Sequence, residues 1–280
     1  MTNLDVGILH PGEMGISVAA SAQNSGHSVY WASQGRSAQT HARAEEFNLL
    51  DAGTLAQLCA TCSAIISVCP PHAAEVVADQ VLAHGFSGLY LDANAISPER
   101  AMRIGQRVEA GGAAFVDGGI IGGPAWQPNR TWLYLSGEGA QNAVPLFSAG
   151  PLEIAVIGDE IGKASALKMC YAAYTKGSSA LLCAILATAE SLGVRADLEG
   201  QWSRGGSDFA EQTTKRVRRV TAKAWRFAGE MDEIAATFEQ AGLPGGFHAS
   251  AAEIYQRMAG FKDSKSTPDL EDVLTALLDG

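Results

Sequence analysis

The stretch GILHPGEMG, residues 7–15, joins an apolar run to a segment of small residues. The run DVGIL at 5–9 is short and apolar, which is typical of a buried strand, and GISVAASAQNS at 15–25 can form a closely packed helix. The glycine and proline between them are typical of a turn. This stretch therefore predicts a strand, a tight turn and a helix at the start of the chain.

The same alternation continues through the first half of the chain. Apolar runs bounded by turn residues predict further strands in HSVYWA at 27–32, SAIISV from Ser63, GLYLDAN from Gly88, AAFVDGG from Ala113, TWLYLSG from Thr131 and LEIAVIG from Leu152. Strands that alternate with helices form a parallel sheet covered on both faces. We therefore expect an α/β domain, with a Rossmann-type doubly wound parallel sheet, over residues 1–159.

From residue 160 the pattern changes to helical periodicity. The run KASALKMCYAAYTKGSSALLCAILATAESLG at 163–193 is rich in alanine and leucine and predicts one long helix. Two more helical segments, at 208–242 and 247–261, are separated by the stop signal GLPGG at 242–246. We therefore expect an all-helical second domain over residues 160–280, joined to the first through the long helix.

Composition limits the kinds of partner. Thirty acidic and 20 basic residues give a net charge of −10, which repels nucleic acid and anionic lipid, so we expect a small-molecule partner and neither nucleic acid nor membrane. The start MTNLDVGILH lacks the basic and apolar regions of an export signal, which favours a cytoplasmic location. The five cysteines fit reduced thiols, and the pair in CATC at 59–62 lacks further ligands at metal-binding spacing, so no metal site is predicted.

The opening turn is similar to the dinucleotide fingerprint G-x-G-x-x-G with its first glycine replaced. The three glycine places hold His10, Gly12 and Gly15. Histidine is enriched among the non-glycine residues found at positive φ, which favours it as a substitute, although an ordinary strand-to-helix turn remains an alternative. Backbone amides after the proline would still meet a phosphate, so the turn predicts cofactor contacts from His10, Pro11, Gly12, Glu13 and Met14.

The segment after the second predicted strand indicates which dinucleotide binds. An NAD site usually places Asp or Glu about 20 residues after the turn, to hold the ribose 2′-hydroxyl. This chain has ASQGRS at 32–37, with hydroxyls and a guanidinium but no carboxylate. These groups suit a 2′-phosphate, so the sequence predicts NADP (NADPH), with Ser33, Arg36 and Ser37 as ligands. A solvated loop arginine is the alternative interpretation of Arg36.

The order of the motifs resembles the β-hydroxyacid dehydrogenase superfamily, which includes 6-phosphogluconate and 3-hydroxyisobutyrate dehydrogenases, with imine reductases as a divergent branch. HPGEMG at 10–15 stands where that family has G-L-G-x-M-G, and SVCPP at 67–71 resembles its cofactor loop. LDANAISPE at 91–99 is similar to its D-x-S-T-x-x-P segment, and DGGIIGGPA at 117–125 to its substrate-binding D-A-P-V-S-G-G-x-x-A. The resemblance implies cofactor contacts from Cys69 and Pro70 and a substrate contact from Ile121. The backbone amides of Gly122 and Gly123 can meet a substrate oxygen, and the amide of Asn94 can touch nicotinamide or substrate; a turn-forming role is the alternative in both cases.

Lys168 falls where that family keeps its catalytic lysine. The resemblance implies that Lys168 handles the proton, whereas a lysine on an alanine-rich helix is otherwise usually a solvated charge. Tyr171 lies three residues later on the same helix face and is a candidate donor or relay, with aromatic packing as the alternative. The family's serine in S-G-G is Ile121 here, and its asparagine four residues after the lysine is Ala172. A substrate carboxylate would therefore lose two polar partners.

The expected reaction is NADP-dependent hydride transfer between a nicotinamide and a small hydroxy acid, aldehyde or ketone. An imine reductase is the alternative, which the loss of the serine and asparagine favours and Lys168 opposes; a dinucleotide-binding sensor without turnover is a third interpretation. The long apolar helix has few predicted helices to cover it, which favours a homodimer through the second domain. The resemblance implies that the partner completes the active site, with groups near Trp225 and His248 as candidates. A helix-capping or packed histidine is the alternative for His248.

Overall fold

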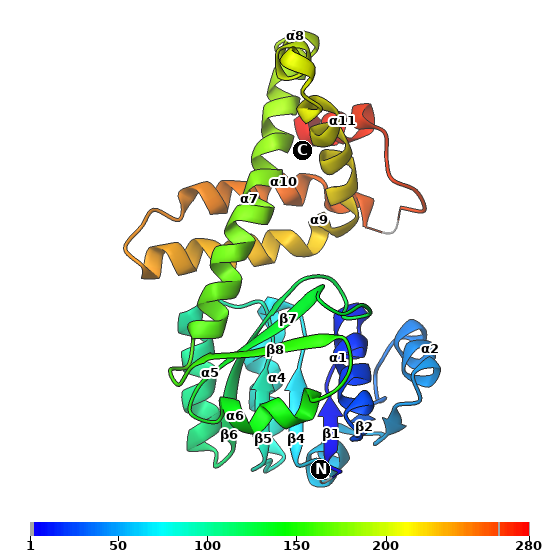
Figure 1. The fold of residues 1–280 in the computed structure, drawn as a ribbon, viewed down its shortest axis with the longest axis vertical. Coiled ribbons are helices and arrows are strands. Elements are labelled where there is room, and N and C mark those ends of the chain that lie inside the picture. The colour runs from blue at the N-terminus through cyan, green and yellow to red at the C-terminus, as the bar shows by residue number, and fades with distance from the viewer. Residues whose placement is uncertain (1–2, 263, 280) are drawn as a thin grey trace. The chain divides into compact units, whose positions relative to one another are not determined.

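The computed structural model describes residues 3–262 and 264–279, and the chain divides into two compact units, Met1–Met169 and Cys170–Gly280 (Figure 1). The first unit contains an eight-stranded sheet in the order β3-β2-β1-β4-β5-β6-β7-β8. Every neighbouring pair is parallel except β6 and β7. The strands are β1 Asp5–Ile8, β2 Ser28–Trp31, β3 Leu50–Asp51, β4 Ala64–Ser67, β5 Leu89–Asp92, β6 Ala114–Ile121, β7 Thr131–Ser136 and β8 Leu152–Gly158.

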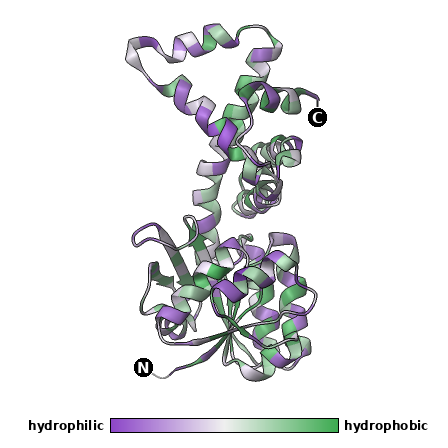
Figure 2. Cartoon of the chain, turned by 90° about the vertical axis from the view of Figure 1, so that its right-hand side faces the viewer, coloured by the Kyte–Doolittle hydropathy of each residue, from purple (hydrophilic) through white to green (hydrophobic). Residues whose placement is uncertain are grey.

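The central strands β1, β4, β5 and β6 are buried on both faces, as a doubly wound fold requires. Successive residues of one strand enter different cores: Ile66 packs in the cluster with α1, and Ile65 in the cluster with α3, α4 and α5. The strands accordingly appear as strongly hydrophobic ribbons in Figure 2. The expected Rossmann-type sheet is confirmed. Its helices are α1 Glu13–Asn24, α2 Ala38–Glu46, α3 Leu55–Thr61, α4 Ala74–Ala83, α5 Pro98–Ala110 and α6 Ala140–Ala143, with 3₁₀ turns η1 Pro71–Ala73 and η2 Val144–Phe147.

The second unit is helical, as expected. Its elements are the greater part of α7 Lys163–Ser191, then α8 Arg195–Trp202, η3 Arg204–Gly206, α9 Phe209–Gln240, α10 Gly246–Arg257, η4 Ala259–Phe261 and α11 Leu270–Asp279. The stop signal after α9 works through Gly242, whose φ of +77° favours glycine and whose N–H donates to the carbonyl of Glu239 at 2.9 Å. Within the described ranges no helix is both long and apolar enough to span a bilayer.

The boundary between the units falls after Met169, inside α7, rather than at residue 159. The first turns of α7 pack on β6 because Gly119 has no side chain. A Cβ at that position would lie 2.5 Å from the carbonyl oxygen of Ala164. This close approach makes the start of α7 part of the sheet unit and carries Lys168 with it.

Candidate active site

The opening turn places the N-terminus of α1 at the carboxyl end of β1. Gly12 is the N-cap of α1, and its N–H donates to the carbonyl of His10 at 2.8 Å. A Cβ on Gly15 would lie 2.1 Å from that same His10 oxygen, whereas a Cβ on Gly12 would meet no atom within 4 Å. Gly15 therefore lets the helix pack on the turn, and Gly12 borders open space beside the free N–H groups of the helix. This arrangement fits a dinucleotide pyrophosphate.

His10 does not replace the first glycine for the reason expected. Among the described residues, the non-glycine residues at positive φ are Asn48 and Asn129, so the expectation of a left-handed conformation at His10 was wrong. Its imidazole is instead largely buried, and the Nδ1 atom has no hydrogen-bond partner. Burial, together with the positive charge of Arg36, lowers the pKa of His10 to about 4. The imidazole is therefore neutral at physiological pH.

Arg36 lies against the turn. Its Nη2 donates to the carbonyl of Leu9 at 3.1 Å, and its Nε donates to the carbonyl of Ala32 at 3.4 Å. Ser37 caps α2, because its hydroxyl accepts from the N–H of Thr40 at 3.3 Å. Ser33 accepts from the N–H of Arg36 through its carbonyl. The three predicted 2′-phosphate ligands thus share one loop, in which Arg36 reaches the dinucleotide turn and Ser37 has a local structural role.

Arg43 is a further cation at this turn, and the sequence analysis missed it. It lies on α2, and its Nη1 donates to the carbonyl of Pro11 at 3.2 Å. Side chains of a helix point toward its N-terminus, which lets a residue from the second turn of α2 reach back to the start of α1. The available signal was a second arginine about two helical turns after Arg36.

The loop after β4 is fixed by Asn94. The side-chain oxygen of Asn94 accepts from the N–H of Cys69 at 2.6 Å, and its amide nitrogen donates to the hydroxyl of Ser67 at 3.1 Å. Only 2% of Asn94 is exposed. These bonds favour the turn-forming alternative for Asn94, in which it holds the N–H of Cys69 at the carboxyl edge of the sheet. Burial and the nearby Asp92 raise the pKa of the Cys69 thiol to about 12.

Asp92 on β5 and Asp117 on β6 are paired in the sheet register. Both carboxylates are buried, and the sequence analysis missed them. Asp117 accepts from the hydroxyl of Ser136 at 2.9 Å, from the N–H of Gly162 at 2.9 Å, and from both the N–H and hydroxyl of Ser165 at 3.0 and 2.6 Å. Asp92 accepts from the N–H of Asn94 at 3.0 Å, and its Oδ2 has no partner. Burial, reinforced by Asp117, raises the pKa of Asp92 to about 7.

Asp117 fixes the beginning of α7 and thereby the position of Lys168. One turn beyond Ser165, the half-buried Lys168 donates from Nζ to the carbonyl of Ile120, at the end of β6. Gly119 permits this contact, because a Cβ there would lie 3.1 Å from the Cβ of Lys168. The structure therefore brings the predicted catalytic lysine to the strand end that continues into the predicted substrate loop.

That loop exposes its glycine pair. Gly122 has a φ of +125°, and a Cβ there would lie 2.4 Å from the carbonyl oxygen of Arg130, so only glycine fits. The carbonyl of Gly123 accepts from the hydroxyl of Thr131 at 2.7 Å. The predicted substrate loop thus begins directly after Ile120, the residue that Lys168 contacts. Its backbone is exposed at Gly122 and Gly123.

The remaining predicted site residues belong to the second unit. Tyr171 is 49% exposed on α7, and Trp225 is 42% exposed on α9 with the ammonium of Lys262 4.3 Å from its ring centre. His248 is 5% exposed, and its ring lies 4.3 Å from that of Phe238. These contacts favour the packed-histidine alternative within the helical unit. Across the described residues no group of His, Cys, Asp and Glu side chains could hold a metal ion.

Comparison with known proteins agrees with the geometry of the turn. The family described as the NAD binding domain of 6-phosphogluconate dehydrogenase matches residues 5–149, and a domain of unknown function (DUF1932) matches residues 189–258. A protein of Methanothermus fervidus, the uncharacterized 28.5 kDa protein in the 7S RNA 5′ region, is 31% identical over 155 residues. That match covers 55% of this chain and 59% of the relative, so the chain spans less than two thirds of its length.

Solved structures share the fold over nearly the whole chain. The conserved protein MTH1747, of unknown function and structurally similar to 3-hydroxyacid dehydrogenases, is 28% identical with a TM-score of 0.67, over 92% of this chain and 97% of that protein. The 3-hydroxyisobutyrate dehydrogenase of Mycobacterium tuberculosis with L-serine is 18% identical with a TM-score of 0.69, over 99% of both chains. An imine reductase variant from Myxococcus stipitatus with NAD⁺ is 16% identical with a TM-score of 0.56, over 99% and 100%.

The family match covers more than half of the chain and includes every strand up to β7. It contains the turn at Gly12, the Asn94-held loop and the glycine pair of the predicted substrate loop. The resemblance inferred from the motifs is therefore confirmed. The chain belongs to the family of NAD(P)-binding oxidoreductases whose nucleotide-binding domain is that of 6-phosphogluconate dehydrogenase.

Proposed function

We propose that the chain is an NADP-dependent oxidoreductase that transfers a hydride between the nicotinamide and a small hydroxy acid, aldehyde or ketone. The observation that carries this proposal is the position of Lys168, whose ammonium lies at the end of β6 beside the exposed Gly122 and Gly123. The nicotinamide, when bound, supplies or accepts the hydride. Lys168 donates a proton to the carbonyl oxygen during reduction and accepts it from the hydroxyl during oxidation.

The preference for NADP rests on the loop after β2. Arg36 brings a guanidinium to the dinucleotide turn, and residues 32–37 contain no carboxylate that could hold a free ribose 2′-hydroxyl. Charge-assisted bonds from a guanidinium suit a phosphate dianion. We place this activity in the cytoplasm, which agrees with five cysteines that are all unpaired.

Reduction of a C=N bond is the second candidate. Ile121 and the buried Ala172 stand where the superfamily has polar groups for a substrate carboxylate, and the loss of both groups favours a less polar substrate. An iminium ion is already protonated on its nitrogen, so its reduction mainly requires that the substrate be positioned against the nicotinamide. The shared fold with an imine reductase is consistent with this alternative.

Replacement of Lys168 by alanine tests the proposal. NADPH affinity should persist, because Lys168 lies outside the dinucleotide turn, while turnover of a carbonyl substrate falls roughly 10²–10⁴-fold, the range for a general acid or base. Lys163→Ala is the matched control on α7, since Lys163 is exposed and pairs with Glu160 at 3.4 Å. Full carbonyl turnover by Lys168→Ala would refute the proposed role, and selective survival of imine turnover would favour the second candidate.

We also propose that the chain acts as a homodimer whose partner contributes to the active site. Apolar side chains of the second unit remain exposed, among them Leu181 at 46%, Phe247 at 52% and Leu278 at 43%. They line an apolar groove of about 360 Å³ formed by α7, α10 and α11. A second copy that covers this groove could bring its Trp225 to the active site, as the family resemblance implies.

A further inference from the structure

Two arginines of the segment after β2 lie against the dinucleotide turn. Arg36 donates to the carbonyl of Leu9 and Arg43 to the carbonyl of Pro11, so the two guanidiniums contact the backbone on either side of His10. His10 is neutral, because its pKa is lowered to about 4, and adds no charge between them. Two cationic side chains thus converge on one short stretch of backbone.

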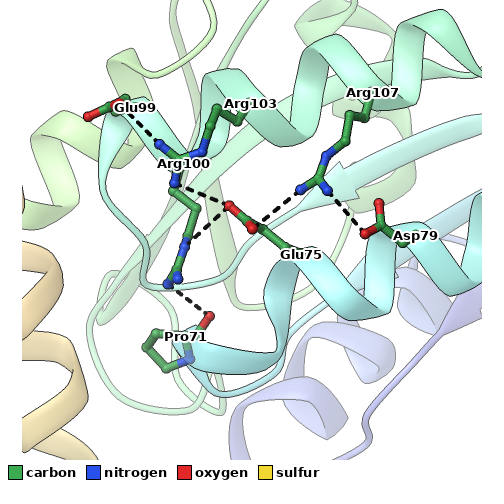
Figure 3. Close-up of polar contacts among 7 residues, drawn as sticks. All are labelled: Pro71, Glu75, Asp79, Glu99, Arg100, Arg103 and Arg107. Atoms are coloured by element: carbon green, nitrogen blue, oxygen red, sulfur yellow. Dashed lines mark hydrogen bonds and ion pairs between the residues drawn. The ribbon is translucent and has the colours of Figure 1, made fainter.

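Within the described part of the chain, no carboxylate neutralises the charges of these two arginines. The arginines of α5 provide the contrast in Figure 3: Arg103 pairs with Glu75 at 3.2 Å and Glu99 at 3.1 Å, and Arg107 with Asp79 at 3.0 Å. Among residues 3–262 and 264–279, neither Arg36 nor Arg43 pairs with a carboxylate; their acceptors are backbone carbonyls. A guanidinium has five N–H donors, so donors of both side chains remain for an anion.

The fold indicates which phosphate these donors meet. The pyrophosphate of a dinucleotide lies at the N-terminus of α1, whereas the segment after β2 faces the adenosine ribose. Arg36 precedes the N-cap of α2 directly, and Arg43 stands on α2 itself. A ribose 2′-phosphate carries a charge between about −1.5 and −2, which two cations match better than one.

We propose that Arg43, together with Arg36, binds the 2′-phosphate of the adenosine moiety and determines the preference for phosphorylated nucleotides. This inference rests on the proposed NADP-dependent function and adds a ligand on α2 that the loop after β2 does not contain. Arg43 contributes through its guanidinium fork, which a lysine cannot reproduce.

Nucleotide fragments test this without any substrate. The full-length protein and its Arg43→Ala, Arg43→Lys and Arg36→Ala variants are titrated by calorimetry with adenosine 2′,5′-bisphosphate and with 5′-AMP, which lacks the 2′-phosphate. Arg43→Ala should weaken binding of the bisphosphate roughly 10–100-fold, the range for a charge-assisted contact, and change binding of 5′-AMP less than about twofold. Arg107→Ala, which removes an equal charge from α5, should alter neither.

The outcomes separate this inference from the function on which it rests. A wild-type protein that prefers the 2′-phosphate, with Arg43→Ala unchanged or weakened equally for both nucleotides, would overturn the role of Arg43 alone. A wild-type protein that shows no preference would refute the NADP proposal and this inference together. If Arg43→Ala proves unstable by thermal unfolding, Arg43→Lys decides: retained binding of the bisphosphate would contradict the guanidinium role, and selective loss would support it.

Discussion

Gly12 and Gly15 stand three residues apart in the turn but differ in what a methyl group would meet. Gly15→Ala should destabilise the fold by roughly 1–3 kcal/mol or more, because its Cβ would lie 2.1 Å from the His10 oxygen. Gly12→Ala should leave the free energy of unfolding nearly unchanged but weaken NADPH binding about tenfold or more, because its Cβ enters the open space beside the helix N-terminus. Urea unfolding and fluorescence titration of both variants measure the two effects. Equal stability losses would contradict this division of roles.

Asp92 makes stability depend on pH. Its pKa is about 7 in the folded chain and about 3.8 when exposed, so the folded state holds a proton that the unfolded state releases between these values. Its contribution to stability is complete below pH 4 and is lost as the pH rises to 7, with a slope of up to about 1.4 kcal/mol per pH unit. Asp92→Asn should reduce this slope, because an amide keeps the bond from Asn94 without ionising.

Urea denaturation of wild type and Asp92→Asn at pH 5 and pH 8 checks this dependence. The unfolding free energy of Asp92→Asn minus that of wild type should be larger at pH 8 than at pH 5. Asp117, whose pKa is also raised by burial, interacts with Asp92, so the comparison reports the titration of the pair. A pH-independent difference would show that Asp92 does not bind the additional proton.

The contacts between distant residues explain why part of the site could not be predicted. Lys168, Arg36 and the glycines were predicted because their types occur at fixed offsets in a recognisable order. Arg43 and Asp117 act through partners 32 and 48 residues away, and no local spacing encodes those contacts. His248 shows the converse: the family resemblance made it a candidate ligand, and the rings of Phe238 and Phe247 that pack against it became visible only in the folded chain.

The anchor of α7 makes a prediction for that helix. Asp117→Ala should cost roughly 3 kcal/mol or more of unfolding free energy, because the buried N–H groups of Gly162 and Ser165 lose their acceptor. Turnover should also fall, since the start of α7 sets the position of Lys168. Glu160→Ala is the control, because its exposed pair with Lys163 contributes about 0–1 kcal/mol. Unchanged stability of Asp117→Ala, measured by urea unfolding, would contradict the anchoring role.

Helices and strands with strong patterns were predicted, and short or irregular ones were not. The long helix begins at Lys163 as expected, and the GLPGG signal ends α9 through Gly242. Strand β3 contains only Leu50 and Asp51, which is too short to show any periodicity. The antiparallel pairing of β6 with β7 also escaped prediction, because alternation of strands and helices indicates parallel neighbours and no helix separates these two.

The proposed homodimer forms through the exposed apolar surface of the helical unit. The homodimer proposal predicts that Leu181→Glu, which places a charge in the groove of α7, α10 and α11, converts dimer to monomer at micromolar concentration. Val76→Glu is the matched control, since Val76 is 57% exposed on α4 of the other unit. Light scattering after size exclusion measures both. A monomeric wild-type protein would refute the dimer, and a dimeric Leu181→Glu variant would exclude this groove as its interface.

The position of the unit boundary inside α7 limits how such proteins can be recombined. A chimaera that exchanged helical domains at residue 159, directly after the last strand, would take Ala164 and Ser165 from one parent and Asp117 from the other. Strand β6 of one parent would then have to pack at Gly119 against helix α7 of the other parent. A crossover beyond Met169 keeps Lys168, strand β6, the predicted substrate loop and the buried carboxylate of Asp117 in one inherited block.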